Sequence, residues 1–239
     1  MLGLIEATEE YNNQGALLGI DVAEDPELLA ALRKMNPVQR QWVINKLTRP
    51  PIASRGSRAE MEKFFNELPQ SIKDGLKKGE LRLADATIYS IKPASSKTIK
   101  MFEPQDDKDV GLRNISNAKL PKNQAMLVSG IYMLAGVSAD ATKDKVTAAE
   151  YKGLENFHAI ANGEFTLTSN RKQIVPATGN AVFKTASYHT VPLGYYKLAN
   201  PRLIQDDIQI EFTIELGSLD GIAAFTHVYV GLHGTITTP

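Results

Sequence analysis

The chain has 239 residues, which is enough for one large domain or two small ones. With 27 basic and 27 acidic residues it carries no net charge, which argues against a whole surface that attracts nucleic acid or anionic membrane. The absence of cysteine excludes disulfides, thiolate catalysis and cysteine-ligated metals. The start, "MLGLIEATEE", lacks the features of a secretory signal, and no apolar run is long enough to span a membrane.

Residues 1–80 carry helix signals. Good helix formers follow an N-cap pattern in "DPELLAALRKM", and Ser57 with Glu60 fits a capping box. Pro69 is placed to open a last short helix and Gly79 to end it. We therefore predict an α-helical N-terminal arm or subdomain over residues 1–80.

Residues 81–239 carry strand and turn signals. The segment 147–162 interrupts them as a short helix or a long excursion. The number and spacing of the strands predict a mainly β domain, a single eight-stranded jelly roll or β-sandwich. The expected strands lie near residues 82–92, 97–103, 125–137, 163–169, 172–176, 194–204, 207–216 and 227–237.

Two of these strands have informative patterns. In "DDIQIEFTIEL" apolar residues from Ile208 to Leu216 alternate with polar ones, which predicts one dry face in the core. In "AMLVSGIYMLAGV" strict alternation places Met126, Val128, Tyr132 and Leu134 on one face and Leu127, Ile131, Met133 and Ala135 on the other. Both faces are apolar, so we expect the outer one to be covered by the helical segment or by another subunit.

The helical segment has an uneven charge distribution. Residues 1–32 contain acidic residues but no Lys or Arg, whereas most of the charged residues in 33–63 are basic. The basic loop "RPPIASRGSR" holds Arg49, Arg55 and Arg58, which are candidate contacts for a neighbouring subunit or a polyanion. The alternative is an ordinary solvated linker between solvated helices.

Catalytic and metal-binding patterns are weak. His227 and His233, six residues apart on one strand, share a face but lie about 20 Å apart, so they cannot share an ion. We expect the histidines to be unrelated surface or loop residues. The loop "EPQDDKDVG" fails the calcium-loop pattern and is expected to be a solvated acidic turn. Without a nucleophile elbow or phosphate-binding loop, we predict no enzyme, no cofactor and no small-molecule substrate.

Two other classes of protein remain open. A ligand- or receptor-binding jelly roll, for carbohydrate or host attachment, would present aromatic side chains, and Tyr188, Tyr195 and Tyr196 are the candidate cluster. A metal-dependent cupin-like enzyme is weaker. The segment "PLGYYKLAN" has Lys197 where the cupin motif needs a histidine.

Several blocks of the sequence resemble the jelly-roll capsid proteins of tailless icosahedral bacteriophages. They are "SRGSRAEMEKFF", "GELRLADATIYSIK", "VGLRNISNAKLPKNQAMLVSGIYMLAGV", "GYYKLANPRLI", "DDIQIEFTIEL" and "HVYVGLHGTI", which span about residues 54 to 239. Many major capsid proteins of these phages carry two jelly rolls, whereas this chain has room for one, and its N-terminal arm is not strongly basic.

The resemblance implies a virion structural protein without catalytic residues. Its partners would be further copies of the chain in a shell lattice and other virion proteins, with viral membrane or genome as partners of the N-terminal segment. Such a protein is made in the host cytoplasm and resides in the virion. Whether it is a major capsid, vertex or minor virion protein stays open.

Overall fold

The computed structural model describes residue 61 and residues 63–185 and 192–239. The chain divides into two compact units, Met1–Pro69 and Gln70–Pro239. The described part of the first unit contains the 3-10 helix η1 (Phe65–Glu67). The helices expected within residues 1–60, with the capping box of Ser57 and Glu60, lie outside the described residues. The domain boundary after residue 80 stays a prediction.

Helix α5 (Gln70–Lys78) begins directly after Pro69, as predicted. Its last turn carries Lys77 and Lys78, whose positive charges stabilise the helix by interacting with the negative end of its dipole. Gly79 follows with φ +77°, a left-handed conformation that costs glycine nothing. Its neighbour Glu80 donates its N–H to the Gly75 carbonyl at 2.9 Å, so the helix ends where the sequence predicts.

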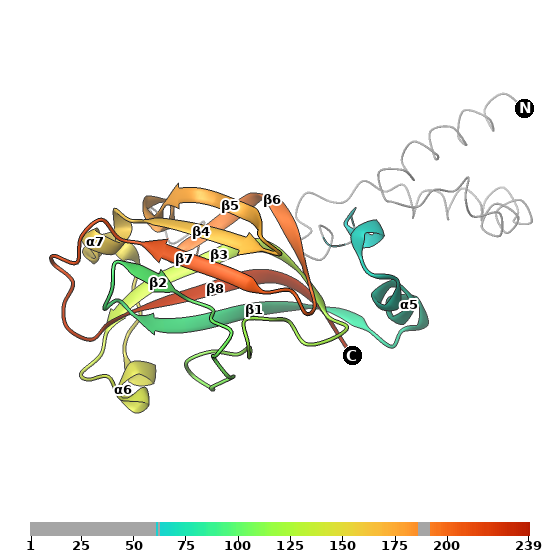
Figure 1. Ribbon diagram of the computed structural model, residues 1–239, viewed down its shortest axis with the longest axis horizontal. Helices are drawn as coiled ribbons and strands as arrows, with labels where there is room; N and C mark the ends of the chain where they lie inside the picture. Colours follow the sequence, from blue (N-terminus) through green and yellow to red (C-terminus); the bar gives the residue numbers. More distant parts are fainter. Residues whose placement is uncertain (1–60, 62, 186–191) are drawn as a thin grey trace, which may run out of the picture. The chain divides into compact units, whose positions relative to one another are not determined.

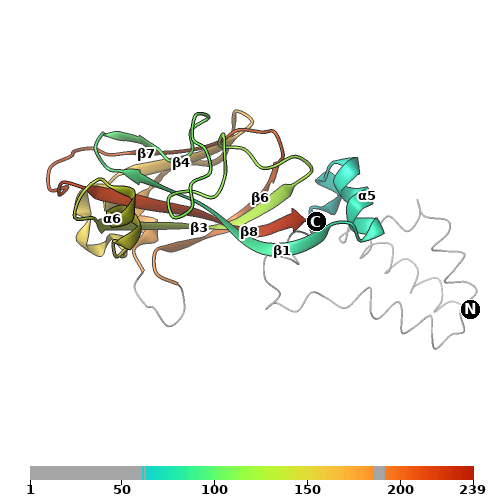
Figure 2. The same cartoon turned by 90° about the horizontal axis from the view of Figure 1, so that it is seen from below.

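Eight strands form two four-stranded antiparallel sheets, which lie as two layers in Figure 2. One sheet has the order β1-β8-β3-β6 and the other β2-β7-β4-β5 (Figure 1). The mainly β, sandwich-like fold predicted from the alternating sequence patterns is therefore confirmed. The strands are β1 (Arg82–Pro93), β2 (Thr98–Lys100), β3 (Ala125–Val137), β4 (Glu164–Ser169), β5 (Lys172–Gly179), β6 (Tyr195–Gln205), β7 (Ile210–Glu215) and β8 (Thr226–Thr238).

The strand pairs are nested along the chain. Strand β1 pairs with β8, β2 with β7, β3 with β6 and β4 with β5, all antiparallel. Two further pairings, β3 with β8 and β4 with β7, join these pairs into the two sheets. The longest ladder runs from Arg82 opposite Thr238 to Pro93 opposite His227, so the first and last strands are neighbours.

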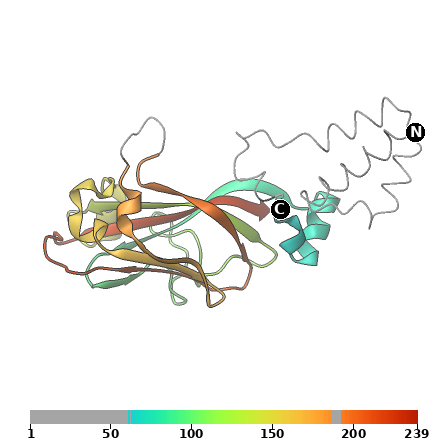
Figure 3. The same ribbon diagram turned by 90° about the horizontal axis from the view of Figure 1, so that it is seen from above.

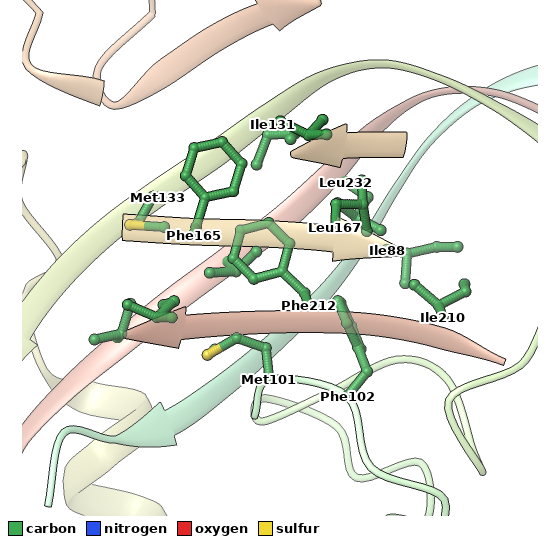
Figure 4. Close-up of a cluster of buried hydrophobic side chains, with 14 of the residues drawn as sticks. Ile88, Met101, Phe102, Ile131, Met133, Phe165, Leu167, Ile210, Phe212 and Leu232 are labelled. Carbon is green, nitrogen blue, oxygen red and sulfur yellow. The ribbon is translucent and has the colours of Figure 1, made fainter. Parts of the chain in front are cut away.

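The core lies between the two sheets. Phe165 of β4 and Phe212 of β7 stack with ring centroids 5.3 Å apart and planes at 10° (Figure 4). Ile131 of β3 and Leu232 of β8 belong to the same buried cluster from the opposite sheet. All four side chains are at most 1% exposed, so burial of these apolar faces drives the sheets together.

Strand β3 contains a bulge that the alternation rule missed. The ladders to β6 and β8 both shift register between Val128 and Gly130. Met126 and Val128 face the core before the bulge, and Ile131, Met133 and Ala135 face it afterwards. The predicted division of this strand into two faces was therefore wrong, because one extra residue inverts every side chain that follows it.

Three strand ends differ from the prediction. Strand β7 begins at Ile210, because Asp207 adopts φ 55° in a turn and Ile208 lies outside the strand. Strand β5 continues past Pro176 to Gly179; it lies at a sheet edge, where a missing N–H is tolerated. Strand β2 ends at Lys100. Beyond its end, Met101 donates its N–H to the Phe212 carbonyl at 2.9 Å.

The excursion between β3 and β4 contains short helices, as the sequence predicts. These are α6 (Lys143–Ala148), η2 (Leu154–Asn156) and α7 (His158–Ala161), and a further helix η3 (Asn180–Phe183) follows β5. They lie at the same end of the second unit as the loop between β7 and β8, whereas the C-terminus lies at the other end (Figures 1 and 3). Within the described ranges, no helix is long and apolar enough to cross a membrane.

Candidate functional site

The site residues predicted from sequence are Arg49, Arg55 and Arg58. All three lie within residues 1–60, outside the described residues. Their role as contacts for a subunit or a polyanion stays a prediction. The candidate surfaces below are therefore all built from residues of the second unit.

The outer face of the β1-β8-β3-β6 sheet carries a tyrosine from each of its four strands. Tyr132 lies between two core-facing residues of β3, and Tyr229 lies between the core-facing Val228 and Val230 of β8, so both rings point away from the core. Tyr89 and Tyr195 precede inward-facing residues in the same way. We call this surface the tyrosine face and define it as Tyr89, Tyr132, Tyr151, Tyr195, Tyr229 and His233.

Neighbouring rings of the tyrosine face contact one another in pairs. Tyr89 stacks on Tyr229 with centroids 5.7 Å apart and planes at 16°. Tyr132 lies 4.7 Å from Tyr195, and the His233 ring meets both edge-on, at 5.8 Å and 6.1 Å. Tyr151, from the excursion before η2, lies 6.2 Å from Tyr229 and extends the row.

Glycines in the central strands make room for these rings. A Cβ atom on Gly130 would lie 2.1 Å from the Tyr195 hydroxyl, so the Tyr195 ring occupies the space above this residue. A Cβ atom on Gly231 would lie 3.3 Å from Tyr229 in the same way. The Tyr195 ring of β6 thus covers the Gly130 backbone of the neighbouring strand β3, an arrangement that compensates for glycine in a sheet, whereas Tyr229 and Gly231 both belong to β8.

Most of the tyrosine face was not predicted from the sequence. It grouped Tyr188, Tyr195 and Tyr196 because they are close in the chain. Tyr196 instead packs inward against Phe165 and Phe183, with centroids at 6.5 Å and 5.9 Å, and Tyr188 lies outside the described residues. The useful signal was alternation: each outward tyrosine adjoins a residue of the core.

The hydroxyls of Tyr132, Tyr151 and Tyr229 keep their protons at neutral pH. Burial raises the pKa of Tyr132 and of Tyr229, and the charges of Tyr89 and Tyr132 add to the effect at Tyr229. Burial also raises the pKa of Tyr151 to about 12. The surface therefore offers neutral hydrogen-bonding groups and ring faces, which suit binding better than nucleophilic chemistry.

Ionisation of Tyr151 is expected to lower stability only at high pH. The folded state holds this proton more tightly than the unfolded state, because its pKa rises from 10.0 to about 12. The free energy of unfolding should fall as the pH rises from about 10 to about 12. Below about pH 10 this tyrosine should give it no pH dependence. Urea unfolding across this range should show a smaller fall for Tyr151→Phe, and equal pH slopes for the two proteins would contradict the assignment.

The histidines occupy separate environments. His227 is 6% exposed in β8, and its Nδ1 lies 2.8 Å from the Phe225 carbonyl, so the expectation of a surface or loop residue was wrong for it. His233 Nδ1 lies 3.0 Å from the Thr87 hydroxyl on the tyrosine face. In the part of the chain that the structure describes, no three His, Asp or Glu side chains gather as metal ligands would.

The predicted acidic turn is only partly solvated. Asp106 lies 2.7 Å from Lys92 Nζ and 3.2 Å from Arg113 Nη1, and its side chain is 14% exposed. Asp109 pairs with Lys143 of α6, whereas Asp107 is exposed. The turn therefore links the β2–β3 connection to β1 through the ion pair of Asp106 with Lys92, which is a role in stabilising the fold.

Removing the Asp106 carboxylate is expected to cost about 1–3 kcal/mol of unfolding free energy. Asp106→Ala leaves Lys92 and Arg113 partly buried without this shared partner. The exposed Asp107→Ala variant is the matched control and should stay within about 0.5 kcal/mol of the wild type. Urea denaturation measures both, and equal midpoints for the two variants would show that the ion pairs contribute nothing.

A second candidate surface lies at the end of the sandwich where the β7–β8 loop extends (Figure 1). A cavity of about 500 Å³ opens there. Phe225 at its margin is 48% exposed, which is unusual for so large an apolar side chain. We call this surface the loop-end pocket and define it by its lining: Pro93, Ala94, Ser95, Ala141, Leu219, Ile222, Ala223, Ala224, Phe225, Thr226 and His227.

The tyrosine face and the loop-end pocket are the two candidate surfaces of the second unit. The tyrosine face is aromatic and half-buried, and the loop-end pocket is mostly apolar. Among known proteins, no family model matches the chain and a search of curated proteins finds no match, so the functional proposal rests on the fold and on these two surfaces.

Proposed function

We propose that the chain is a virion structural protein, a capsid subunit that self-assembles into an icosahedral shell through barrel packing and an N-terminal helical arm. The observation that carries the proposal is the nested order of strand pairs, β1 with β8, β2 with β7, β3 with β6 and β4 with β5. This order supports the proposal, because a jelly roll, the fold of many viral capsid domains, arises when a long antiparallel hairpin is wound into two four-stranded sheets.

The burial of the central strands supports a subunit that packs through its sheet. Leu127 of β3 is fully buried and yet lies outside the core cluster between the sheets. Its strand and β8 are buried along most of their length on both sides. The burial of these two strands is provided by the chain itself, whereas the outward tyrosines of the same sheet stay partly exposed, and an aromatic outer face favours protein contacts.

The assembly mechanism follows from the rigidity of the sandwich. Each barrel would serve as a fixed block whose outer surfaces meet those of neighbouring copies and other virion proteins. A stable contact of this kind buries about 1,000 Å² or more in total. The N-terminal segment would tie neighbours together, with viral membrane or genome as its further partners. The function requires no cofactor, and its site is the virion.

Light scattering coupled to size-exclusion chromatography, followed by electron microscopy, tests the proposal. The full chain should form oligomers as its concentration rises, and closed particles should appear under assembly conditions. A protein that stays monomeric at every concentration and salt condition, with no particles, would overturn it.

The tyrosine face favours a second function, a jelly-roll module that binds carbohydrate or a host receptor. Aromatic rings on a sheet can stack on the apolar faces of sugars, and Tyr132 and Tyr195 supply the closest pair. A glycan array would show hits that a Tyr132→Ala variant loses. An array without hits would count against this second function.

A further inference from the structure

The sequence contains two Asp–Gly pairs, Asp74–Gly75 and Asp220–Gly221, and one Asn–Gly pair, Asn162–Gly163. At such pairs an aspartate or asparagine side chain can react with its own backbone, because glycine has no side chain to hinder the approach. The reacting backbone atom is the amide nitrogen of the glycine. The fold gives this nitrogen a different environment in each pair.

The Asp220–Gly221 pair lies in the loop between β7 and β8. Both residues are exposed, and Gly221 adopts φ +81° in a turn that the Ile222 N–H closes on the Leu219 carbonyl at 3.2 Å. Among the described residues, the Gly221 N–H has no hydrogen-bond acceptor. A Cβ atom on Gly221 would meet nothing within 4 Å, so the turn leaves room for the Asp220 side chain to approach this nitrogen.

The other two pairs hold the same nitrogen in a hydrogen bond. The Gly163 N–H donates to the Ile160 carbonyl at 3.1 Å, and Gly163 is buried. Gly75 lies within α5, where the regular helix pattern gives each amide N–H a carbonyl four residues earlier as its acceptor. Asp74 also accepts a hydrogen bond from Gln70 Nε2 at 2.8 Å. Reaction at either pair therefore requires the fold to open locally first.

We propose that Asp220 is a modification site, at which the folded protein converts aspartate to isoaspartate without an enzyme. The Gly221 nitrogen attacks Cγ of the protonated Asp220 carboxyl and forms a C–N bond. The carboxyl hydroxyl leaves as water, together with the proton of that nitrogen. Solvent water then opens the cyclic imide at one of its two carbonyl groups, which restores aspartate or gives isoaspartate.

Isoaspartate at position 220 changes the shape of the loop-end pocket. In the product the backbone runs through the former side-chain carbons, so the chain between Leu219 and Ile222 becomes one atom longer. Both of these residues line the pocket and pack against the core. The modification therefore alters a surface of the folded protein as it ages, whether or not the chain is a shell subunit.

The first test compares the three pairs within one molecule. The full chain is incubated for weeks in neutral buffer, either folded or unfolded in guanidinium chloride, and electron-transfer dissociation mass spectrometry distinguishes isoaspartate from aspartate at each position. We expect folding to slow the reaction at positions 74 and 162 by at least about tenfold and to leave position 220 within about threefold of its unfolded rate. Folding that slows position 220 as much as position 74 would overturn the proposal.

The second test places an Asn–Gly pair in the loop. In Asp220→Asn the attack of the same nitrogen releases ammonia, so the product gains a negative charge that ion-exchange chromatography detects. In the folded variant the amide at position 220 should be lost at least about tenfold faster than that of Asn162, although glycine follows both. Equal loss at the two positions would show that the loop does not favour the reaction and would sink the proposal.

A variant of the glycine separates the role of the nitrogen from that of the loop. Gly221→Asn suits the positive φ of this position but places a side chain beside the reacting nitrogen. Isoaspartate at position 220 should then form several-fold more slowly, with unchanged circular dichroism. Unchanged isoaspartate formation in this variant would contradict the attack by the Gly221 nitrogen.

Discussion

Phe165→Ala is expected to lower the free energy of unfolding by about 3–5 kcal/mol. The Phe165 ring is fully buried, stacks on Phe212 and lies 5.1 Å from Phe183. Truncation removes contacts with both sheets and leaves a cavity that the rigid strands cannot close. Urea denaturation followed by circular dichroism measures the loss, and the slope of the transition should stay unchanged.

A matched control separates this core effect from a general loss of apolar surface. Val182→Ala shortens an apolar side chain that is 38% exposed in η3, next to the buried Phe183. We expect a change within about 0.5 kcal/mol. A loss below about 1 kcal/mol for Phe165→Ala would show that the two sheets do not share the core described above.

Gly234→Ala is the second substitution with a large expected effect, about 3 kcal/mol. A Cβ atom at this position would lie 1.8 Å from the Leu127 carbonyl oxygen and 3.2 Å from the Ser129 nitrogen. These are backbone atoms of the β3 bulge, so no rotation of a side chain can relieve the clash. The central ladder must shift, and we expect a marked drop in the thermal midpoint.

Gly217→Ala is the control for the glycine substitution. An added Cβ atom meets nothing within 4 Å there, and the residue follows β7 in the loop toward β8. We expect a neutral effect or a gain of up to about 1 kcal/mol from a stiffer unfolded chain. Similar losses at positions 217 and 234 would contradict the fit of the bulge against Gly234.

Local features of the fold could be predicted from the sequence. Strand and turn signals located all eight strands, and the Pro69 and Gly79 signals located α5. The signal failed where one residue departs from the regular period. The bulge after Val128 inverts the rest of β3, and the αL conformation of Asp207 ends the alternation that begins at Ile208.

The candidate surfaces could not be predicted, because they combine residues that are far apart in the chain. Tyr89 and Tyr229 stack although they are 140 residues apart in the chain, and the sequence around each tyrosine gives no sign of the other. The loop-end pocket likewise joins Pro93 to Ala141 and Phe225. Chain proximity suggested Tyr195 with Tyr196, whereas alternation in a strand sends neighbouring side chains to opposite faces.

The place of β8 between β1 and β3 has a consequence for biosynthesis. Residues 226–238 are synthesised after the other seven described strands, yet they lie in the middle of their sheet. Until β8 is present, β1, which carries Ile88, has no neighbouring strand in its sheet. Strand β3, which carries Ile131 and Met133, is then paired only with β6, so this side of the core stays incomplete. Completion of this sheet requires pairing of β1 with β8, which are far apart in the chain, so refolding in a stopped-flow experiment should be slow.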